Sequence, residues 1–480
     1  MSEIKKVKPS LPSGTRDFLP QEVAKRNYIF GIIKSVFEQY GFQQIETPVL
    51  ENLSTLTGKY GEEGDQLLFK VLNSGDYLKD ADAATLSNKD SKKLTAQIAE
   101  RGLRYDLTVP LARYVVQHQN DLVFPFKRYH IAPVWRADRP QKGRYREFYQ
   151  CDADIIGSNS LLNEVELTYI LHEVFKKLNI NVTIRFNHRE ILMRIAHIFY
   201  KKELESKSDT SLSKDDFYSE FIKALDKIDK VGVEGVNKEF ADKGFDLSNL
   251  EFLWTFIKRM NEAKTVAEKY AIIKELLNAS NVDFDWKAVY AGLDIFIEDL
   301  FEKFESLDNV KFDFTLARGL DYYTGTIWEV VSNDVKMGSI AAGGRYANLT
   351  EMFGGRDMSG VGISFGVERI YDIMEELKLF PQDALKTTKV LFVHFSEANR
   401  DFAFPLVQQL REANVSVELY PDKAKMEKQM KYANAKGIPY VVVIGDNEMQ
   451  SGKLTVKDMR SGTQEEKTFA ELLSFFTAKQ

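Results

Sequence analysis

The sequence lacks several features that mark secreted or membrane proteins. It has one cysteine among 480 residues, so no internal disulfide can form, and this usage suits a reducing compartment. No run of about 18 apolar residues occurs, and the N-terminal segment "MSEIKKVKPSLPSGTRDFLP" has no apolar core of signal-peptide length. We therefore expect a cytoplasmic protein without membrane contact.

Metal and dinucleotide motifs are also missing. The six histidines are scattered and no cysteine cluster accompanies them, so a protein-held zinc is not expected. Gly360, Gly362 and Gly366 do not follow the G-x-G-x-x-G spacing, which argues against a dinucleotide-binding dehydrogenase. Because the net charge is −6, any polyanion must be bound by a local basic patch.

The character of the chain changes along its length. Residues 188–309 have long helical periodicities and indicate a helical insertion. The stretch 310–331, "VKFDFTLARGLDYYTGTIWEVV", predicts two strands around a turn. After Pro381, strands and helices alternate, which predicts an α/β domain with a largely parallel sheet.

The most informative stretch is 136–157, "RADRPQKGRYREFYQCDADIIG". It contains five cations within 136–146 and then two carboxylates, Asp152 and Asp154. Its Pro and Gly predict a hairpin loop between two strands, and side chains alternate between the faces of a strand. One predicted face carries Arg144, Arg146, Phe148, Gln150, Asp152 and Asp154.

That order of side chains predicts a binding face. Phosphates would lie at the arginine end, a flat ring on Phe148, and a cationic amine at the aspartate end. A solvated charged surface is the alternative, but the excess of arginine over lysine favours planar, bidentate binding of phosphate or carboxylate.

Two further clusters point to anion binding. Arg318 is placed at a predicted strand end, near Tyr322 and Tyr323; core packing explains the tyrosines equally well, but not the arginine. Arg369 falls in the first turn of a predicted helix, where a cation opposes the helix dipole unless an anion lies nearby.

Taken in order, these stretches resemble class II aminoacyl-tRNA synthetases. "PSGTRDFLP", "LARGLDYYTGTIWE" and "AAGGRYANL" are similar to signatures of the histidyl-tRNA synthetase family. The resemblance implies an α+β chain with an antiparallel-sheet catalytic domain, a helical insertion and a C-terminal α/β anticodon-binding domain. The implied boundaries are 1–187 and 310–383 for the two catalytic parts, 188–309 for the insertion and 387–480 for the anticodon-binding domain.

The resemblance also implies an activity: ATP-dependent activation of L-histidine to histidyl-adenylate, then transfer of histidine to the 3′ end of its tRNA. ATP is expected as a substrate with Mg²⁺, and the chain as a homodimer. The implied catalytic residues are Arg136 and Arg318. The implied ATP-binding residues are Arg136, Arg144, Phe148 and Arg369. The implied histidine-binding residues are Asp106, Thr108, Arg136, Gln150, Asp154, Arg318, Tyr322 and Tyr323.

Contacts to tRNA are expected at two places. The loop residues Arg139 and Gln141 are candidates for reading the acceptor end. The lysine-rich stretch 423–436 forms either a solvated helix face or a phosphate-contacting edge, and its candidate residues are Lys423, Lys425, Lys428 and Lys431.

Two alternatives stay open at this level. One is a catalytically silent regulatory paralogue that serves as a binding subunit, although such proteins tend to lose the key arginines and the anticodon domain. The other is a class II enzyme for a different amino acid, against which "RGLDYYTG" argues. The sequence also departs from the class pattern Arg-x-Glu, because Asp138 replaces the glutamate.

Overall fold

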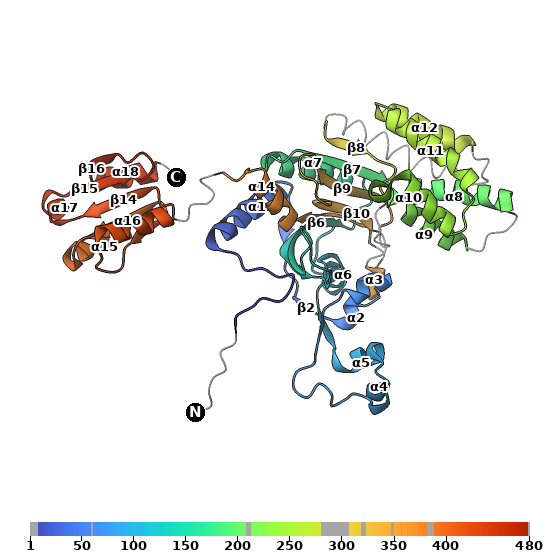
Figure 1. Cartoon of the computed structure of the whole chain (residues 1–480), viewed down its shortest axis with the longest axis horizontal. Helices are drawn as coiled ribbons and strands as arrows, with labels where there is room; N and C mark the ends of the chain where they lie inside the picture. The colour runs from blue at the N-terminus through green and yellow to red at the C-terminus, as the bar shows by residue number, and fades with distance from the viewer. Residues whose placement is uncertain are drawn as a thin grey trace. The chain divides into compact units, whose positions relative to one another are not determined.

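The computed structural model describes residues 8–58, 61–207, 213–279, 307–317, 323–346, 350–356, 358–381 and 388–478 (Figure 1). Arg318 and Tyr322 lie outside these ranges. The chain divides into two compact units: Met1–Asp17 with Ile29–Leu379, and Phe18–Tyr28 with Phe380–Gln480. Among the described helices, none has the length and apolar character needed to cross a membrane.

An eight-stranded sheet forms the centre of the first unit. Its six inner strands are antiparallel, and one short strand joins each edge in parallel. In sheet order the strands are β1 (Gln43–Gln44), β5 (Phe126–Trp135), β6 (Glu147–Ile156), β11 (Gly360–Gly366), β10 (Ala341–Tyr346), β9 (Thr326–Ser332), β7 (Val182–His188) and β8 (Val310–Phe312). The predicted β5–β6 hairpin is therefore confirmed.

Helices cover one face of this sheet. In α1 (Pro20–Gln39), the residues Ile29, Ile33, Val36 and Phe37 recur at helical spacing and are fully buried. The Phe37 ring lies 5.6 Å from Tyr129 of β5, and Phe175 of α7 (Leu162–Lys177) lies 5.6 Å from Phe365 of β11. This face is thus apolar core, which leaves the opposite face available for polar side chains.

A smaller sheet and several short helices connect α1 to β5. The strands β2 (Leu50–Asn52), β4 (Arg101–Leu103) and β3 (Lys70–Val71) form this sheet. The helices are α2 (Leu53–Leu56), α3 (Gly61–Gln66), α4 (Ala83–Ser87), α5 (Ser91–Ile98) and α6 (Thr108–Gln117). Helix α14 (Val367–Glu376) follows β11 directly.

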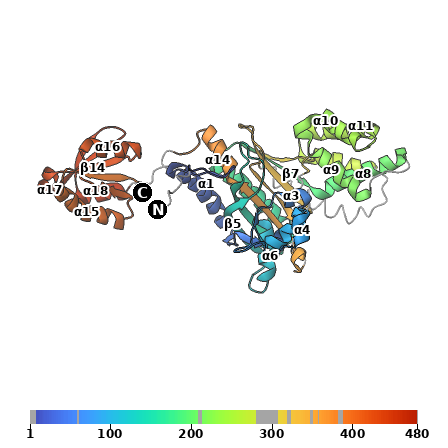
Figure 2. The same cartoon turned by 60° about the horizontal axis from the view of Figure 1, so that its bottom comes forward.

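The region between β7 and β8 is helical where it is described. It contains α8 (Arg189–Lys207), α9 (Lys214–Leu225), α10 (Ile228–Asp242), α11 (Leu250–Glu262) and α12 (Val266–Ala279). Figure 2 shows these helices gathered to one side of the sheet, beside β7. Their shared core includes Phe217, Phe221 and Phe240, all of which are buried.

The two strands predicted in 310–331 are confirmed, and part of the predicted turn lies outside the described residues. The strands β8 and β9 exist, but they do not pair with each other, because β7 lies between them and pairs with both. Local sequence cannot reveal this, since β7 precedes β8 by more than a hundred residues.

The second unit has a five-stranded sheet with the order β13-β12-β14-β15-β16. Its strands are β12 (Val390–His394), β13 (Val417–Leu419), β14 (Tyr440–Ile444), β15 (Lys453–Asp458) and β16 (Gln464–Thr468). Its helices are α15 (Glu397–Glu412), α16 (Met426–Ala435), α17 (Asp446–Ser451) and α18 (Phe469–Thr477). The three predicted strands are parallel, as expected; β15 and β16 add an antiparallel hairpin.

Candidate active site

The face of the large sheet opposite α1 carries a ladder of polar side chains. On β5 and β6, Arg128 lies opposite Asp154, and His130 lies opposite Asp152. The next two cross-strand pairs on this face are Ala132 with Gln150 and Val134 with Phe148. The face therefore runs from an apolar end at Phe148 to a charged end at Asp154.

Small residues on the neighbouring strands leave room above this face. Gly362 of β11 lies beside Asp154, and Ser364 lies beside Asp152. A Cβ atom on Gly362 would lie 2.0 Å from Oδ1 of Asp154, and one on Gly344 of β10 would lie 2.5 Å from the Tyr323 ring. Both positions are thus restricted to glycine by close contact with site side chains.

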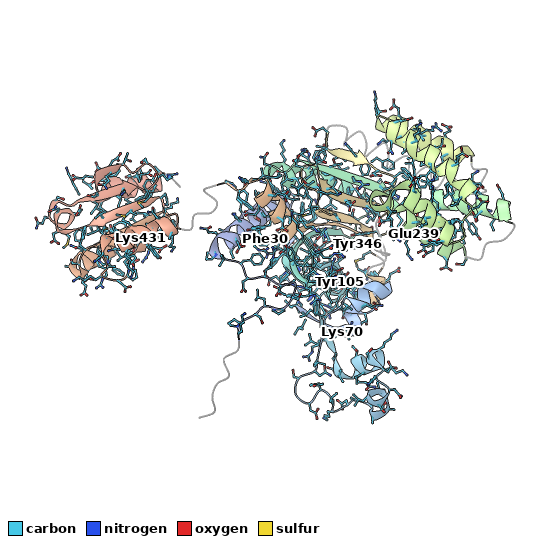
Figure 3. The ribbon with its side chains drawn as sticks, viewed as in Figure 1. Phe30, Lys70, Tyr105, Glu239, Tyr346 and Lys431 are labelled. Atoms are coloured by element: carbon cyan, nitrogen blue, oxygen red, sulfur yellow. The ribbon has the colours of Figure 1, made fainter. Side chains whose placement is uncertain are left out.

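Asp154 is buried and held by two partners. Its Oδ2 lies 2.6 Å from Nη2 of Arg128, and its Oδ1 accepts a hydrogen bond of 2.6 Å from the Tyr346 hydroxyl. Tyr346 ends β10 and is labelled within the sheet unit in Figure 3. Burial raises the pKa of Asp154, and the Arg128 charge opposes that rise. Burial, reinforced by Asp154, also raises the pKa of Tyr346 well above 10, so its hydroxyl remains a donor.

Burial shifts the neighbouring pair in opposite directions. It raises the pKa of Asp152 to about 7, with Asp154 adding to the rise and Arg128 opposing it. Burial and the charges of Arg128 and Arg104 lower the pKa of His130 to about 3, so this imidazole is neutral at physiological pH. The site therefore contains a neutral histidine and a carboxyl group that titrates near neutrality.

Arg136 lies at the other end of the ladder, immediately after β5. Its Nε donates to the carbonyl oxygen of Tyr105 at 3.1 Å. Its guanidinium lies 4.3 Å from the Tyr105 ring centroid and 5.2 Å from that of Phe148 (Tyr105 is labelled in Figure 3). Two aromatic contacts and one carbonyl thus hold the orientation of this cation.

Asp106 and Thr108 follow closely after Tyr105, whose carbonyl oxygen binds Arg136. Asp106 is buried, and its Oδ1 accepts a hydrogen bond of 3.1 Å from the backbone N–H of Val109 in the first turn of α6. Thr108 is half-buried and begins α6. The Asp106 carboxylate therefore satisfies one of the free N–H groups at the start of this helix.

Arg144 and Arg146 are not part of the strand face, because β6 begins at Glu147. Arg144 has an exposed side chain whose Nη1 lies 3.6 Å from Oδ1 of Asp138. Arg146 donates instead to the carbonyl oxygens of Asp138 and Ser13. The alternation from 148 to 154 follows the prediction, whereas the two arginines belong to the hairpin loop.

Arg369 extends from the first turn of α14 toward the same loop. Its Nε donates to the carbonyl oxygen of Gly143 at 2.8 Å, and its Nη1 donates to that of Ser339 at 2.5 Å. These carbonyls explain how a cation is accommodated near the positive end of a helix. The bond from Arg369 to the Gly143 carbonyl oxygen also connects the hairpin loop to α14.

The remaining predicted residues lie in the hairpin loop, beside Gly344 or in the second unit, and Arg318 and Tyr322 fall outside the described ranges. Arg139 and Gln141 are exposed in the hairpin loop, where Gln141 and Arg144 exchange backbone hydrogen bonds. Tyr323 is half-buried against Gly344. Lys423, Lys425, Lys428 and Lys431 lie in the second unit and are exposed.

Sequence reasoning missed Arg128, His130 and Tyr346. A signal was present for the first two, because Arg128 and His130 lie two residues apart on "FKRYHIAPVW" and pair across the hairpin with Asp154 and Asp152. Tyr346 gave no such signal, since it lies almost two hundred residues from Asp154 in the chain.

Comparisons with known proteins identify the family. The family model described as Histidyl-tRNA synthetase matches residues 14–81 and 76–370, and the model described as Anticodon binding domain matches residues 389–479. A histidine–tRNA ligase of Christiangramia forsetii is 52% identical over 95% of this chain and 96% of its own length. That of Porphyromonas gingivalis is 51% identical over the same shares.

Solved structures give the same result. The crystal structure of histidyl-tRNA synthetase from Nostoc sp. PCC 7120 has a TM-score of 0.79 at 29% identity, covering 99% of this chain and 100% of that chain. The large antiparallel sheet is thus the catalytic fold of class II aminoacyl-tRNA synthetases. Within that class, the chain belongs to the histidyl-tRNA synthetase family.

Proposed function

We propose that the chain is a histidine–tRNA ligase that forms histidyl-adenylate from L-histidine and ATP and then transfers histidine to the 3′ end of its tRNA. The observation that carries this proposal is the near full-length match to curated histidine–tRNA ligases at about half identity. The polar ladder from Arg136 to Asp154 supports it, because it offers cations and carboxylates on one continuous face.

Activation requires in-line attack of the histidine carboxylate on the α-phosphorus of ATP, with pyrophosphate as the leaving group. The carboxylate is already ionised at neutral pH, so no general base is needed, and positioning and charge stabilisation supply the rate. Arg136 would bind the α-phosphate and the substrate carboxylate. Its planar group, held by Tyr105 and Phe148, is oriented for two-point contact.

The remaining phosphate and adenine contacts are assigned as follows. Phe148 would stack on adenine, Arg144 would reach the terminal phosphates, and Arg369 would bind the triphosphate from the side of α14. For Arg144 this assignment requires exchange of its weak contact to Asp138 for a phosphate, which its exposed side chain permits. Mg²⁺ would accompany ATP rather than occupy a protein cage; the described residues contain no group of three metal-binding side chains.

Histidine recognition is assigned to the charged end of the ladder. Asp106, Thr108 and Gln150 would hold the α-ammonium group. Asp154 and Tyr323 would bind the imidazole, with Tyr322 adjacent, and Arg318 would stabilise charge on the α-phosphate. A site that hydrogen-bonds both ring nitrogens can reject isosteres that lack them.

For tRNA, we propose contacts from Arg139 and Gln141 in the hairpin loop and from the lysines of the second unit, Lys423, Lys425, Lys428 and Lys431. Lys431 forms an exposed pair with Glu427 at 2.8 Å, which is weak enough for a phosphate to displace. We further propose a cytoplasmic homodimer with the catalytic parts at 1–187 and 310–383, the insertion at 188–309 and the anticodon-binding domain at 387–480.

The test is ATP–pyrophosphate exchange with each of the twenty amino acids in turn. We expect exchange with histidine alone. Exchange with another amino acid would contradict the assigned substrate, and absence of exchange with every amino acid would favour a catalytically silent binding subunit.

A further inference from the structure

Arg128 is a fully buried cation on the site face of β5. Its side chain has 0% of its surface exposed, and its Nη2 lies 2.6 Å from Oδ2 of Asp154. Its Nη2 also donates a long hydrogen bond of 3.4 Å to the carbonyl oxygen of Leu107. A guanidinium does not lose its proton in a protein, so burial at this position requires a counter-charge. Asp154 provides it.

Asp154 is confined on three sides. Arg128 lies opposite it on β5, the Tyr346 hydroxyl donates to its Oδ1, and Gly362 on β11 leaves no space for a Cβ atom beside that oxygen. Each carboxylate oxygen has a second lone pair, so an ionised Asp154 can still accept an N–H group from a ligand.

We propose that Arg128 is a positioning residue for histidine recognition, which acts through Asp154 by keeping this carboxylate ionised and oriented to accept a ring N–H of the substrate. The inference rests on the proposed function, because Asp154 is assigned there to the imidazole. Without Arg128, a buried Asp154 would lack its counter-charge and would take up a proton. A protonated carboxyl group would present an O–H donor to the substrate's ring N–H, which needs a hydrogen-bond acceptor.

The other titratable groups around Asp154 do not replace Arg128. His130 is neutral, Asp152 is a second carboxyl group, and Tyr346 is a neutral donor. Asp106 adds a further acidic group near Asp152. Within the described part of the chain, Arg128 is the one cation within ion-pairing distance of Asp154.

The test measures histidine-dependent pyrophosphate exchange by the full chain and the variants Arg128→Met, Asp154→Asn and the double variant. Arg128→Met should raise the KM for histidine about 100-fold and that for ATP less than threefold, as for loss of one partner of a buried charge pair. The double variant should match Asp154→Asn within about threefold, because residues that act through one contact are not additive. Arg113→Met is the matched control, because it removes the cation that pairs with the buried Glu51 at 2.7 Å, and neither residue is assigned to a substrate.

A second measurement separates positioning from loss of structure. As pH rises from 7 to 9, the KM ratio of Arg128→Met to wild type should fall, because Asp154 regains its charge. A constant ratio would overturn the proposal, as would equal losses for ATP and histidine.

If Arg128→Met does not fold, the double variant, which has no unpaired buried charge, is compared with Asp154→Asn alone. A much higher histidine KM in the double variant would show that Arg128 acts independently of Asp154, and would overturn the proposal. Failure of the wild-type chain to exchange with histidine would instead contradict the proposed function, whatever Arg128 does.

Discussion

His130 of β5 and Asp152 of β6 form a cross-strand pair, and burial shifts the pKa of each side chain. The pKa of Asp152 rises from 3.8 to about 7, so its contribution to stability is complete below pH 3.8 and is lost as the pH rises through 7. The pKa of His130 falls from 6.5 to about 3, so its contribution is present above pH 6.5 and is lost as the pH falls. The two contributions oppose each other between pH 4 and 6.5.

Replacing Asp152 with asparagine isolates one of these contributions. The amide cannot ionise, so Asp152→Asn should gain stability relative to wild type as the pH rises from 5 to 8. Melting temperatures of both proteins at the two pH values give the measurement. Asp121→Asn is the control, since Asp121 is exposed and pairs only loosely with His118. A difference in melting temperature that does not change with pH would contradict the raised pKa.

At the scale of elements, strand β11 leaves room for the Asp154 side chain by carrying Gly362 beside it. Gly362→Ala would place a methyl group within 2.0 Å of Asp154 Oδ1 on an inner strand that cannot shift easily. We expect a loss of about 1–3 kcal/mol in the free energy of unfolding. We also expect a higher KM for histidine in pyrophosphate exchange, because Asp154 is displaced.

Gly31→Ala is the matched control for the Gly362→Ala variant. Gly31 lies in α1, and a Cβ atom there would meet nothing within 4 Å. Alanine should therefore stabilise the chain by about 0.5–1 kcal/mol through helix propensity, with unchanged activity. Equal changes in the free energy of unfolding and in the histidine KM for the two alanine variants would show that the Asp154 contact does not restrict position 362.

At the scale of the whole molecule, the two compact units predict separable activities. Removal of residues 388–480 deletes most of the second unit, including its buried core of Val390, Phe392 and Val442. We expect tRNA charging to fall far more than histidine-dependent pyrophosphate exchange, because the ladder and Arg136 lie entirely in the other unit. Comparing both assays on the truncated and full-length chains gives the measurement; equal losses would mean that the catalytic fold needs the deleted unit.

Local pattern was sufficient for much of the architecture. The change to strand–helix alternation after Pro381 predicted the second unit. The β5–β6 hairpin followed from its loop residues. These features depend on interactions between residues close in sequence, so the periodicity of side chains is enough to specify them.

The sequence by itself determined the family, the hairpin and the order of Phe148, Gln150 and Asp154 along one strand face. Only the tertiary structure decided that β7 separates β8 from β9, that Arg144 leaves the strand face, and that Arg128 and Tyr346 hold Asp154. The reason is physical: strand order and buried ion pairs depend on contacts between distant segments, whose free energy is set by burial and geometry and not by local side-chain pattern.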